Sequence, residues 1–148
     1  MLDHIYTIEM LEREALQIDV FLEEDITDDP EACIARGNIL VTYLARTGKM
    51  LADAKYHKDA ALKSSIMKEL RDNGSCAPSI MKQLVDAACQ ENNYMVNWLE
   101  RLNRTCVHQI DWLRTVVSMA KEERRVSTGV SGQHSSGPGA ADKDYSPF

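Results

Sequence analysis

MVNWLERLNRTCVHQIDWLRTVVSMA, residues 95–120, is the stretch that decides the fold of this chain. It lies within a longer run, residues 79–125, that contains neither Gly nor Pro. Apolar residues recur in it every three or four positions, which is the spacing of a helix whose narrow apolar stripe packs against another helix. The run therefore predicts one long helix over residues 79–125. Its stripe consists of Met95, Leu99, Leu102, Cys106, Ile110, Leu113, Val117 and Ala120.

A second long helix is predicted over residues 31–72. Asp28 or Asp29 suits the N-cap position, and Pro30 suits the first helical position. The apolar spacing of this helix is less regular than that of residues 79–125. Its expected seam consists of Ile34, Val41, Leu44, Leu51, Leu62, Ile66 and Leu70.

The connection between the two long helices is short, because Asn73-Gly74 ends the first and Pro78 begins the next. Helices joined by so few residues pack antiparallel. The expected hairpin is roughly 60 to 70 Å long, with its turn centred near residue 75. Gly37 and Gly48 indicate that a neighbour approaches the second helix closely, and an N-terminal helix is the candidate neighbour.

A shorter helix is predicted over residues 3–24, within an acidic N-terminal unit of residues 1–30. Residues 31–126 form the hairpin, and the Gly- and Ser-rich residues 127–148 are expected to form a disordered linker and tail. The predicted fold class is all-α: a long, coiled-coil-like antiparallel hairpin with an additional N-terminal helix. Such a thin hairpin buries little surface per residue, so we expect a homo-oligomer. The first helix has the stripe Ile5, Ile8, Leu11, Ala15, Ile18 and Leu22.

The charge of the chain is unevenly distributed. Residues 1–31 contain eleven acidic side chains and one basic side chain, whereas residues 32–126 contain fifteen basic and ten acidic ones. An acidic arm beside a mildly basic body can screen the chain's own cations. The alternative is ordinary solvated helix surface.

The sequence offers no signal for export or membrane insertion. Its N-terminal residues lack a basic region followed by an apolar run, and no apolar stretch approaches 18 residues. We therefore expect a cytoplasmic protein without membrane contact. Its four cysteines are then expected to be reduced thiols.

No pattern for catalysis, a cofactor or a metal is found. Asp53 and His57 are spaced to present two ligands on one helical face, as are His108 and Asp111, but the hairpin register puts the pairs roughly 20 Å apart. Cys106 and His108 are two residues apart on a helix and point in different directions. The sequence therefore predicts that the protein is not an enzyme and binds neither a metal nor a cofactor.

Nucleic-acid binding is a further hypothesis. Arg101 and Arg104 share a helical face, and Lys121, Arg124 and Arg125 cluster where the helix is expected to end. Such cations can follow a phosphate backbone. The alternative is that the first of these rows packs against the N-terminal helix. Single-stranded DNA is accordingly a candidate partner, not a required one.

The C-terminal tip, Asp142-Lys-Asp-Tyr-Ser-Pro-Phe148, resembles the tail of bacterial single-stranded-DNA-binding proteins. That resemblance implies docking onto DNA replication and repair proteins, with Asp142, Asp144, Tyr145, Pro147 and Phe148 making the contact. An apolar pocket would take the aromatic ring and a basic rim would meet the acids. Lys143 and Tyr145-Ser146 depart from that family's pattern.

A second resemblance covers residues 38–124, and especially Tyr43-Leu-Ala-Arg-Thr-Gly-Lys-Met-Leu-Ala-Asp-Ala-Lys55 and the helix from Tyr94 to Leu113. These segments are similar to small helical-hairpin proteins of phages and prophages, which lie near genes for strand annealing and single-strand binding. The resemblance implies a role in DNA recombination and carries no catalytic residues.

Together these features predict a non-enzymatic accessory protein of phage or mobile-element DNA replication or recombination. Its tip would recruit DNA-processing partners. The main alternative is a structural coiled-coil scaffold or adaptor that binds no nucleic acid. A third hypothesis is a DNA mimic that acts through the acidic arm, including Glu23, Glu24, Asp25, Asp28 and Asp29.

Overall fold

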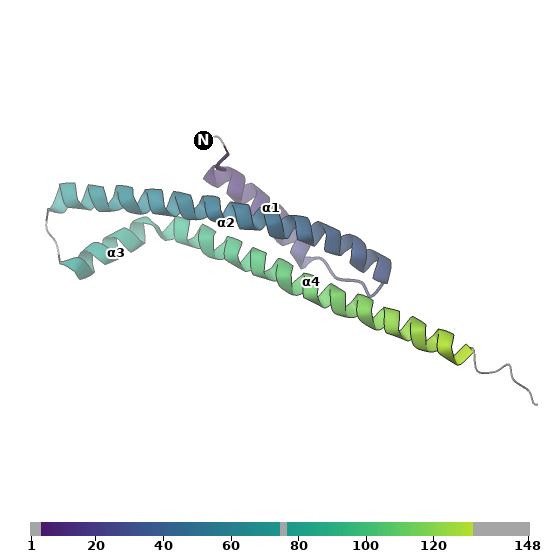
Figure 1. Ribbon diagram of the computed structural model, residues 1–148. Coiled ribbons are helices and arrows are strands. Elements are labelled where there is room, and N and C mark those ends of the chain that lie inside the picture. Colours follow the sequence, from purple (N-terminus) through teal and green to yellow (C-terminus); the bar gives the residue numbers. More distant parts are fainter. Residues whose placement is uncertain (1–3, 75–76, 132–148) are drawn as a thin grey trace, which may run out of the picture.

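The computed structural model describes residues 4–74 and 77–131, which form four α-helices and no strand (Figure 1). The two long helices lie side by side and antiparallel, and α1 packs against both. The predicted all-α helical hairpin with an additional N-terminal helix is thus confirmed. The helices are α1 Ile8–Glu23, α2 Pro30–Asn73, α3 Pro78–Ala88 and α4 Gln90–Ser131.

The register between α2 and α4 centres near residue 75, as the sequence predicted. A Cβ atom built on Gly37 would lie 3.9 Å from Leu113 Cδ1, and one built on Gly48 would lie 4.0 Å from Asn103 Nδ2. The Asn103 amide also donates to the carbonyl oxygen of Leu44 at 3.1 Å. The expectation that α1 approaches the two glycines is wrong, because their neighbour is α4.

The predicted signals at the ends of α2 are confirmed. The Asp29 carboxylate accepts a hydrogen bond from the Ala32 N–H at 2.8 Å, and Pro30 is the first helical residue. Gly74 follows the helix with a φ of +61°, a conformation that glycine adopts without strain. The 44 residues of α2 give a helix about 66 Å long.

The single helix predicted over residues 79–125 is instead two helices. Cys89 separates α3 from α4 with φ −100° and ψ 9°, although its N–H still donates to Val85 O and its carbonyl still accepts from Asn93 N–H. The buried side chains of Val85 and Cys89 accompany this bend. Neither Gly nor Pro marks it, so composition gave no sign of it.

Two predicted boundaries are also corrected. α1 begins at Ile8 and not at residue 3, because Thr7 adopts an extended conformation and its hydroxyl caps the helix through the Met10 N–H. α4 continues to Ser131, so the expected linker does not begin at residue 127. None of the four helices, over the ranges that the structure describes, is both long and apolar enough to span a membrane.

The core confirms the stripes of α1 and α4 and part of the seam of α2, where Leu44 and Leu51 pack against it. Leu11, Ala15, Leu99 and Leu102 are fully or almost fully buried, as expected. On α2, however, the side chains that were expected at the N-terminal part of the seam are more than half exposed: Ile34 at 54% and Val41 at 57%. The positions that are buried on α2 are Cys33, Leu40, Thr47, Met50, Asp53 and Ala54.

Candidate functional site

One face of the α2–α4 pair is covered by α1 and the opposite face is open. Arg36 and Tyr43 on α2 both contact Phe21 of α1. Ile34 and Val41 each precede one of these residues by two positions, which is a rotation of about 200° on an α-helix. Their side chains therefore lie on the side of α2 that faces away from α1.

On the covered face, three side chains on successive turns of α2 hold the backbone before α1. The Asp53 carboxylate accepts from the Tyr6 N–H at 3.1 Å, and His57 Nε2 lies 2.7 Å from the Tyr6 carbonyl oxygen. Lys49 Nζ donates to the His4 carbonyl oxygen at 2.7 Å and also contacts the Asp53 carboxylate. The same nitrogen lies over the Tyr6 ring, 3.9 Å from its centre. We call Lys49, Asp53 and His57 the clamp.

The other end of α1 is held in the same way. Gln109 Nε2 of α4 donates to the Leu22 carbonyl oxygen at 2.7 Å, and Arg36 Nη2 donates to the Phe21 carbonyl oxygen at 2.7 Å. The Arg36 guanidinium also lies 4.3 Å from the centre of the Phe21 ring. Carbonyls in the last turn of a helix lack full intrahelical hydrogen bonding, and these groups donate to two of them. The Phe21 carbonyl also accepts from the Glu24 N–H at 3.4 Å.

Acidic side chains of the N-terminal part pair with cations of the hairpin. Glu14 contacts Arg46 at 3.1 Å, and Asp19 contacts Arg101 at 3.7 Å. Asp19 also accepts from Trp98 Nε1 at 3.2 Å. Arg101 therefore contacts α1 with a side chain that is 70% exposed.

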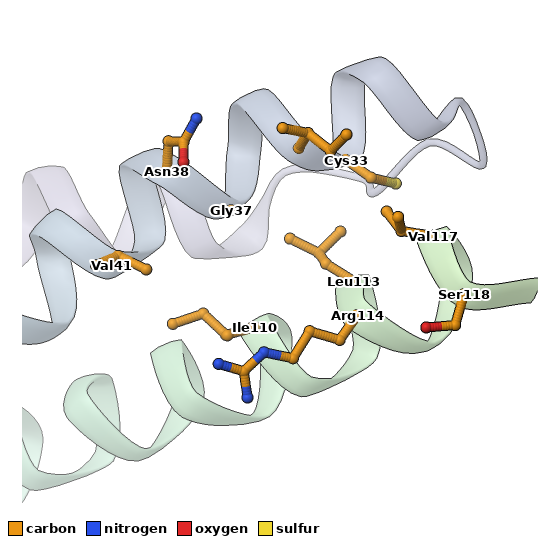
Figure 2. Close-up of a pocket in the computed structure, with 10 residues that line it drawn as sticks. Cys33, Gly37, Asn38, Val41, Ile110, Leu113, Arg114, Val117 and Ser118 are labelled. Carbon is orange, nitrogen blue, oxygen red and sulfur yellow. The ribbon is translucent and has the colours of Figure 1, made fainter. Parts of the chain in front are cut away.

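The open face carries an apolar groove between α2 and α4, with a volume of about 350 Å³. Figure 2 shows Leu113 pointing toward Gly37 across the groove, with Ile110 opposite Val41. Among the described residues no helix covers these side chains on this face. We call this feature the open groove and define it by Ile34, Val41, Ile110, Leu113, Arg114 and Val117.

Beyond the open groove, α4 extends past the start of α2 (Figure 1). Every residue from 121 to 129 is exposed. Lys121, Arg124 and Arg125 lie around one shallow depression on this part of α4. We call residues 121–131 the projecting end.

The structure does not bring the five predicted nucleic-acid-binding residues together. Arg101 and Arg124 are separated by 23 residues of one helix, which corresponds to about 35 Å. At about 100° per residue, Arg101 and Lys121 also point to nearly opposite sides of α4. Arg104 is exposed and follows Arg101 by one turn. The predicted residues therefore form two separate groups, Arg101 with Arg104 and, on the projecting end, Lys121 with Arg124 and Arg125.

Most of the residues that were considered for catalysis or metal binding are buried in the core or contact other residues of the chain. Cys106 is buried, and its burial raises the pKa of its thiol, so it is protonated at neutral pH. Asp53 and His57, which were considered as a ligand pair, hold Tyr6 instead. Asp111 contacts Arg114 at 3.2 Å. Within residues 4–74 and 77–131, no three His, Cys, Asp or Glu side chains gather as a metal-binding group would require.

The predicted partner-binding residues Asp142, Asp144, Tyr145, Pro147 and Phe148 lie outside the described residues, so their role stays a prediction. Sequence reasoning missed the clamp, although Lys49, Asp53 and His57 recur at four-residue intervals on one face. It also missed the open groove, because Ile34 and Val41 were assigned to the core.

Comparison with known proteins does not add an assignment. No family model, curated protein or solved structure matched the chain.

Proposed function

We propose that this chain is a non-enzymatic accessory protein of phage or mobile-element DNA replication or recombination, acting in the cytoplasm. The projecting end contacts single-stranded nucleic acid, and the C-terminal tip recruits a DNA-processing partner. The observation that carries the nucleic-acid contact is the group of cations on an exposed helix end. The DNA setting and the role of the tip are supported by the two sequence resemblances.

The projecting end has the chemistry that a phosphate backbone requires. Among the residues that the structure describes, neither Lys121 nor Arg124 has a carboxylate partner, and Arg125 shares only a 3.7 Å contact with Glu122. Cations that meet phosphates release condensed counterions, so binding weakens as salt rises. Three such contacts on a single strand give a slope of about −2 for log K against log salt.

A scaffold that binds no nucleic acid is the second candidate. It is favoured because several cations of the hairpin pair with acids of the same chain and are therefore less available to phosphates. Arg36, Arg46 and Lys55 each contact a carboxylate within 3.4 Å. In that case the cations of the projecting end are ordinary surface residues, and the hairpin serves only to hold protein partners.

Fluorescence anisotropy of a labelled oligothymidylate separates the two candidates. The full chain is titrated at several salt concentrations beside the double variant Lys121→Glu/Arg124→Glu. The matched control is Lys63→Glu/Lys68→Glu, which makes the same charge change at two exposed positions of α2. We expect the first variant to lose salt-sensitive binding and the control to keep it.

Equal losses of oligonucleotide binding in the two double variants would show that binding depends on net charge and not on the position of the cations. No binding by the unaltered chain would favour the scaffold.

The role of the tip is tested separately with purified replication and repair enzymes. Phe148→Ala in the full chain should remove the aromatic anchor and abolish co-purification. Ser146→Ala, in the same segment, should retain it. Equal co-purification of both variants would contradict the proposed recruitment.

A further inference from the structure

The open groove exposes side chains that are ordinarily buried. Ile34 and Val41 are more than half exposed, and they line the same groove as Ile110, Leu113 and Val117 of α4 (Figure 2). A contiguous apolar groove on a small chain marks a surface at which something binds. Its volume of about 350 Å³ suits a few side chains rather than a whole helix.

A row of cations leads from the groove to the projecting end. Arg114, Lys121 and Arg125 follow one another at intervals of seven and four residues, which keeps them within about 40° of one side of α4. Arg114 lines the groove itself, and the other two lie further along. The surface therefore suits an extended segment that has apolar residues at one end and acids at the other.

Two other occupants fit this surface less well. A second copy related by a two-fold axis parallel to α4 would bring the same row of cations against itself, which is repulsive. Single-stranded nucleic acid that enters a groove stacks its bases on aromatic rings. Among the described residues, none of those that line this groove is aromatic.

We propose that residues 142–148 of this same chain bind in the open groove. The segment Asp142-Lys-Asp-Tyr-Ser-Pro-Phe148 has acids at its start and apolar and aromatic residues at its end. In the bound state it runs back along α4, so that its acids follow the row of cations and Phe148 lies deepest in the groove. Pro147 restricts the backbone and lowers the entropy lost on binding.

The spacing of the acids along residues 142–148 matches the spacing of the cations along α4. In an extended segment at about 3.3 Å per residue, Asp144 lies about 13 Å and Asp142 about 20 Å from Phe148. Along α4, at 1.5 Å per residue, Lys121 lies about 12 Å and Arg125 about 18 Å from Leu113. With Phe148 beside Leu113, Asp144 is therefore level with Lys121, and Asp142 is level with Arg125.

The length of the chain permits this contact within one molecule. Ser131 is 18 residues beyond Leu113 on α4, which is a distance of about 27 Å. The 17 residues from 132 to 148 reach up to about 56 Å when extended. The segment therefore reaches the groove of its own molecule with length to spare.

Binding in the groove has a consequence for recruitment, and only this consequence rests on the proposed function. The residues that dock in the groove are the residues proposed to contact a DNA-processing partner. A partner must therefore displace the tip from the groove, so the chain limits its own recruitment. The same bound acids screen Lys121 and Arg125 from a nucleic-acid strand.

Methyl NMR of the full chain tests the docking without any partner. Spectra are compared for the unaltered chain and for Tyr145→Ala/Phe148→Ala. We expect the methyl signals of Ile34, Val41 and Ile110 to shift between the two. Val20, which is exposed on α1, should not shift.

Two variants serve as controls. Gln133→Ala changes the same tail outside the docking segment and should leave all of these methyl signals in place. Val41→Glu, at an exposed position that tolerates the change, should remove the effect of Tyr145→Ala/Phe148→Ala, with helicity checked by circular dichroism. Raising the salt concentration should weaken the effect, because charge pairs contribute to docking.

The proposal is overturned if Tyr145→Ala/Phe148→Ala leaves the groove methyls unchanged. It is also overturned if the shifts disappear on dilution, because the segment would then come from another molecule. Because a docked tip would screen Lys121 and Arg125, oligonucleotide binding is compared in the unaltered chain and in Tyr145→Ala/Phe148→Ala. Docking with no oligonucleotide binding by either form would leave this inference standing and remove the proposed nucleic-acid contact.

Discussion

The two faces of the α2–α4 pair belong to the same two helices, but α1 covers one face and leaves the other open. On the covered face, side chains of the hairpin bind main-chain atoms of residues 4–24, as the clamp binds Tyr6 and Gln109 binds Leu22. On the open face, apolar side chains such as Val41 remain exposed. The covered face is thus a completed interface, whereas the open face has the composition of an interface without its second half.

The contrast shows how α1 is positioned. Apolar burial by Leu11 and Ala15 favours docking but specifies little about register, because one apolar turn resembles the next. The hydrogen bonds of the clamp are directional and reach one particular peptide unit. Together they fix where α1 begins along α2.

The largest expected difference between the faces is in the free energy of unfolding, and it is measured by substituting two adjacent residues of α2. Leu40→Ala removes a side chain that is 0% exposed and should lower the free energy of unfolding by about 2–5 kcal/mol. Val41→Ala, one position along and on the open face, should cost less than about 1 kcal/mol. Urea denaturation followed by circular dichroism gives both values. Similar losses would mean that the open face is packed like the core.

A smaller effect is expected at the clamp. Asp53→Ala leaves the Tyr6 N–H and the Lys49 ammonium without their shared acceptor, and an unpaired, partly buried donor costs about 1–3 kcal/mol. Amide hydrogen exchange at Tyr6 should accelerate, because this end of α1 is freed. Asp59→Ala, at an exposed position of α2, is the control. Unchanged exchange at Tyr6 would contradict the role of the clamp.

Asn103 tests a polar link between α2 and α4 that is separate from the contacts with α1. Its amide donates to Leu44 O and to Thr47 Oγ1, at 3.1 and 2.9 Å. Asn103→Ala should cost about 1 kcal/mol, the usual net value of a hydrogen bond between neutral groups. Thr105→Ala removes a hydroxyl that bonds only within α4 and should cost about 0.5 kcal/mol or less. Urea denaturation compares the two.

The smallest effect is a pH dependence at the start of α1. Hydrogen bonds from the Glu9 backbone N–H and the Thr7 hydroxyl lower the pKa of Glu9 from its ordinary value of 4.5. A lowered pKa favours the folded state above the unfolded value, and this contribution is lost as the pH falls through the folded value. Glu9→Gln should therefore reduce the loss of stability below pH 4.5.

Urea midpoints measured at neutral and acid pH check this effect. Glu12→Gln, an exposed carboxylate of the same helix, is the matched control. An equal response in both variants would show that the Glu9 hydrogen bonds do not matter for acid stability.

The sequence predicted the fold where a single periodicity decided it. The apolar stripes of α1 and α4 are regular, so their spacing alone located Leu11 and Leu99 in the core. The turn near Gly74 then fixed the register. In the N-terminal part of α2 the buried face is rotated by one residue from the expected seam, to Cys33 and Leu40 rather than Ile34 and Val41. The less regular apolar spacing of this helix did not decide between these two faces.

The candidate site was less predictable for a related reason. Lys121, Arg124 and Arg125 were identified as a cluster because they are adjacent in one helix. The exposure of the open groove depends instead on where α1 packs, and periodicity carries no information about that choice. The bend at Cys89 likewise has no Gly or Pro to announce it.

Hydroxyl-radical footprinting of the full chain tests most directly the claim that the two faces differ and that the tip completes the open one. We expect Tyr145→Ala/Phe148→Ala to raise the oxidation rate of Ile34 and Val41 and to leave Leu11 and Leu40 protected. Equal oxidation of Ile34 and Val41 in the unaltered and altered chains would contradict docking of the tip. Oxidation of Leu11 and Leu40 at the same rate as Val41 would contradict the distinction between the covered and open faces.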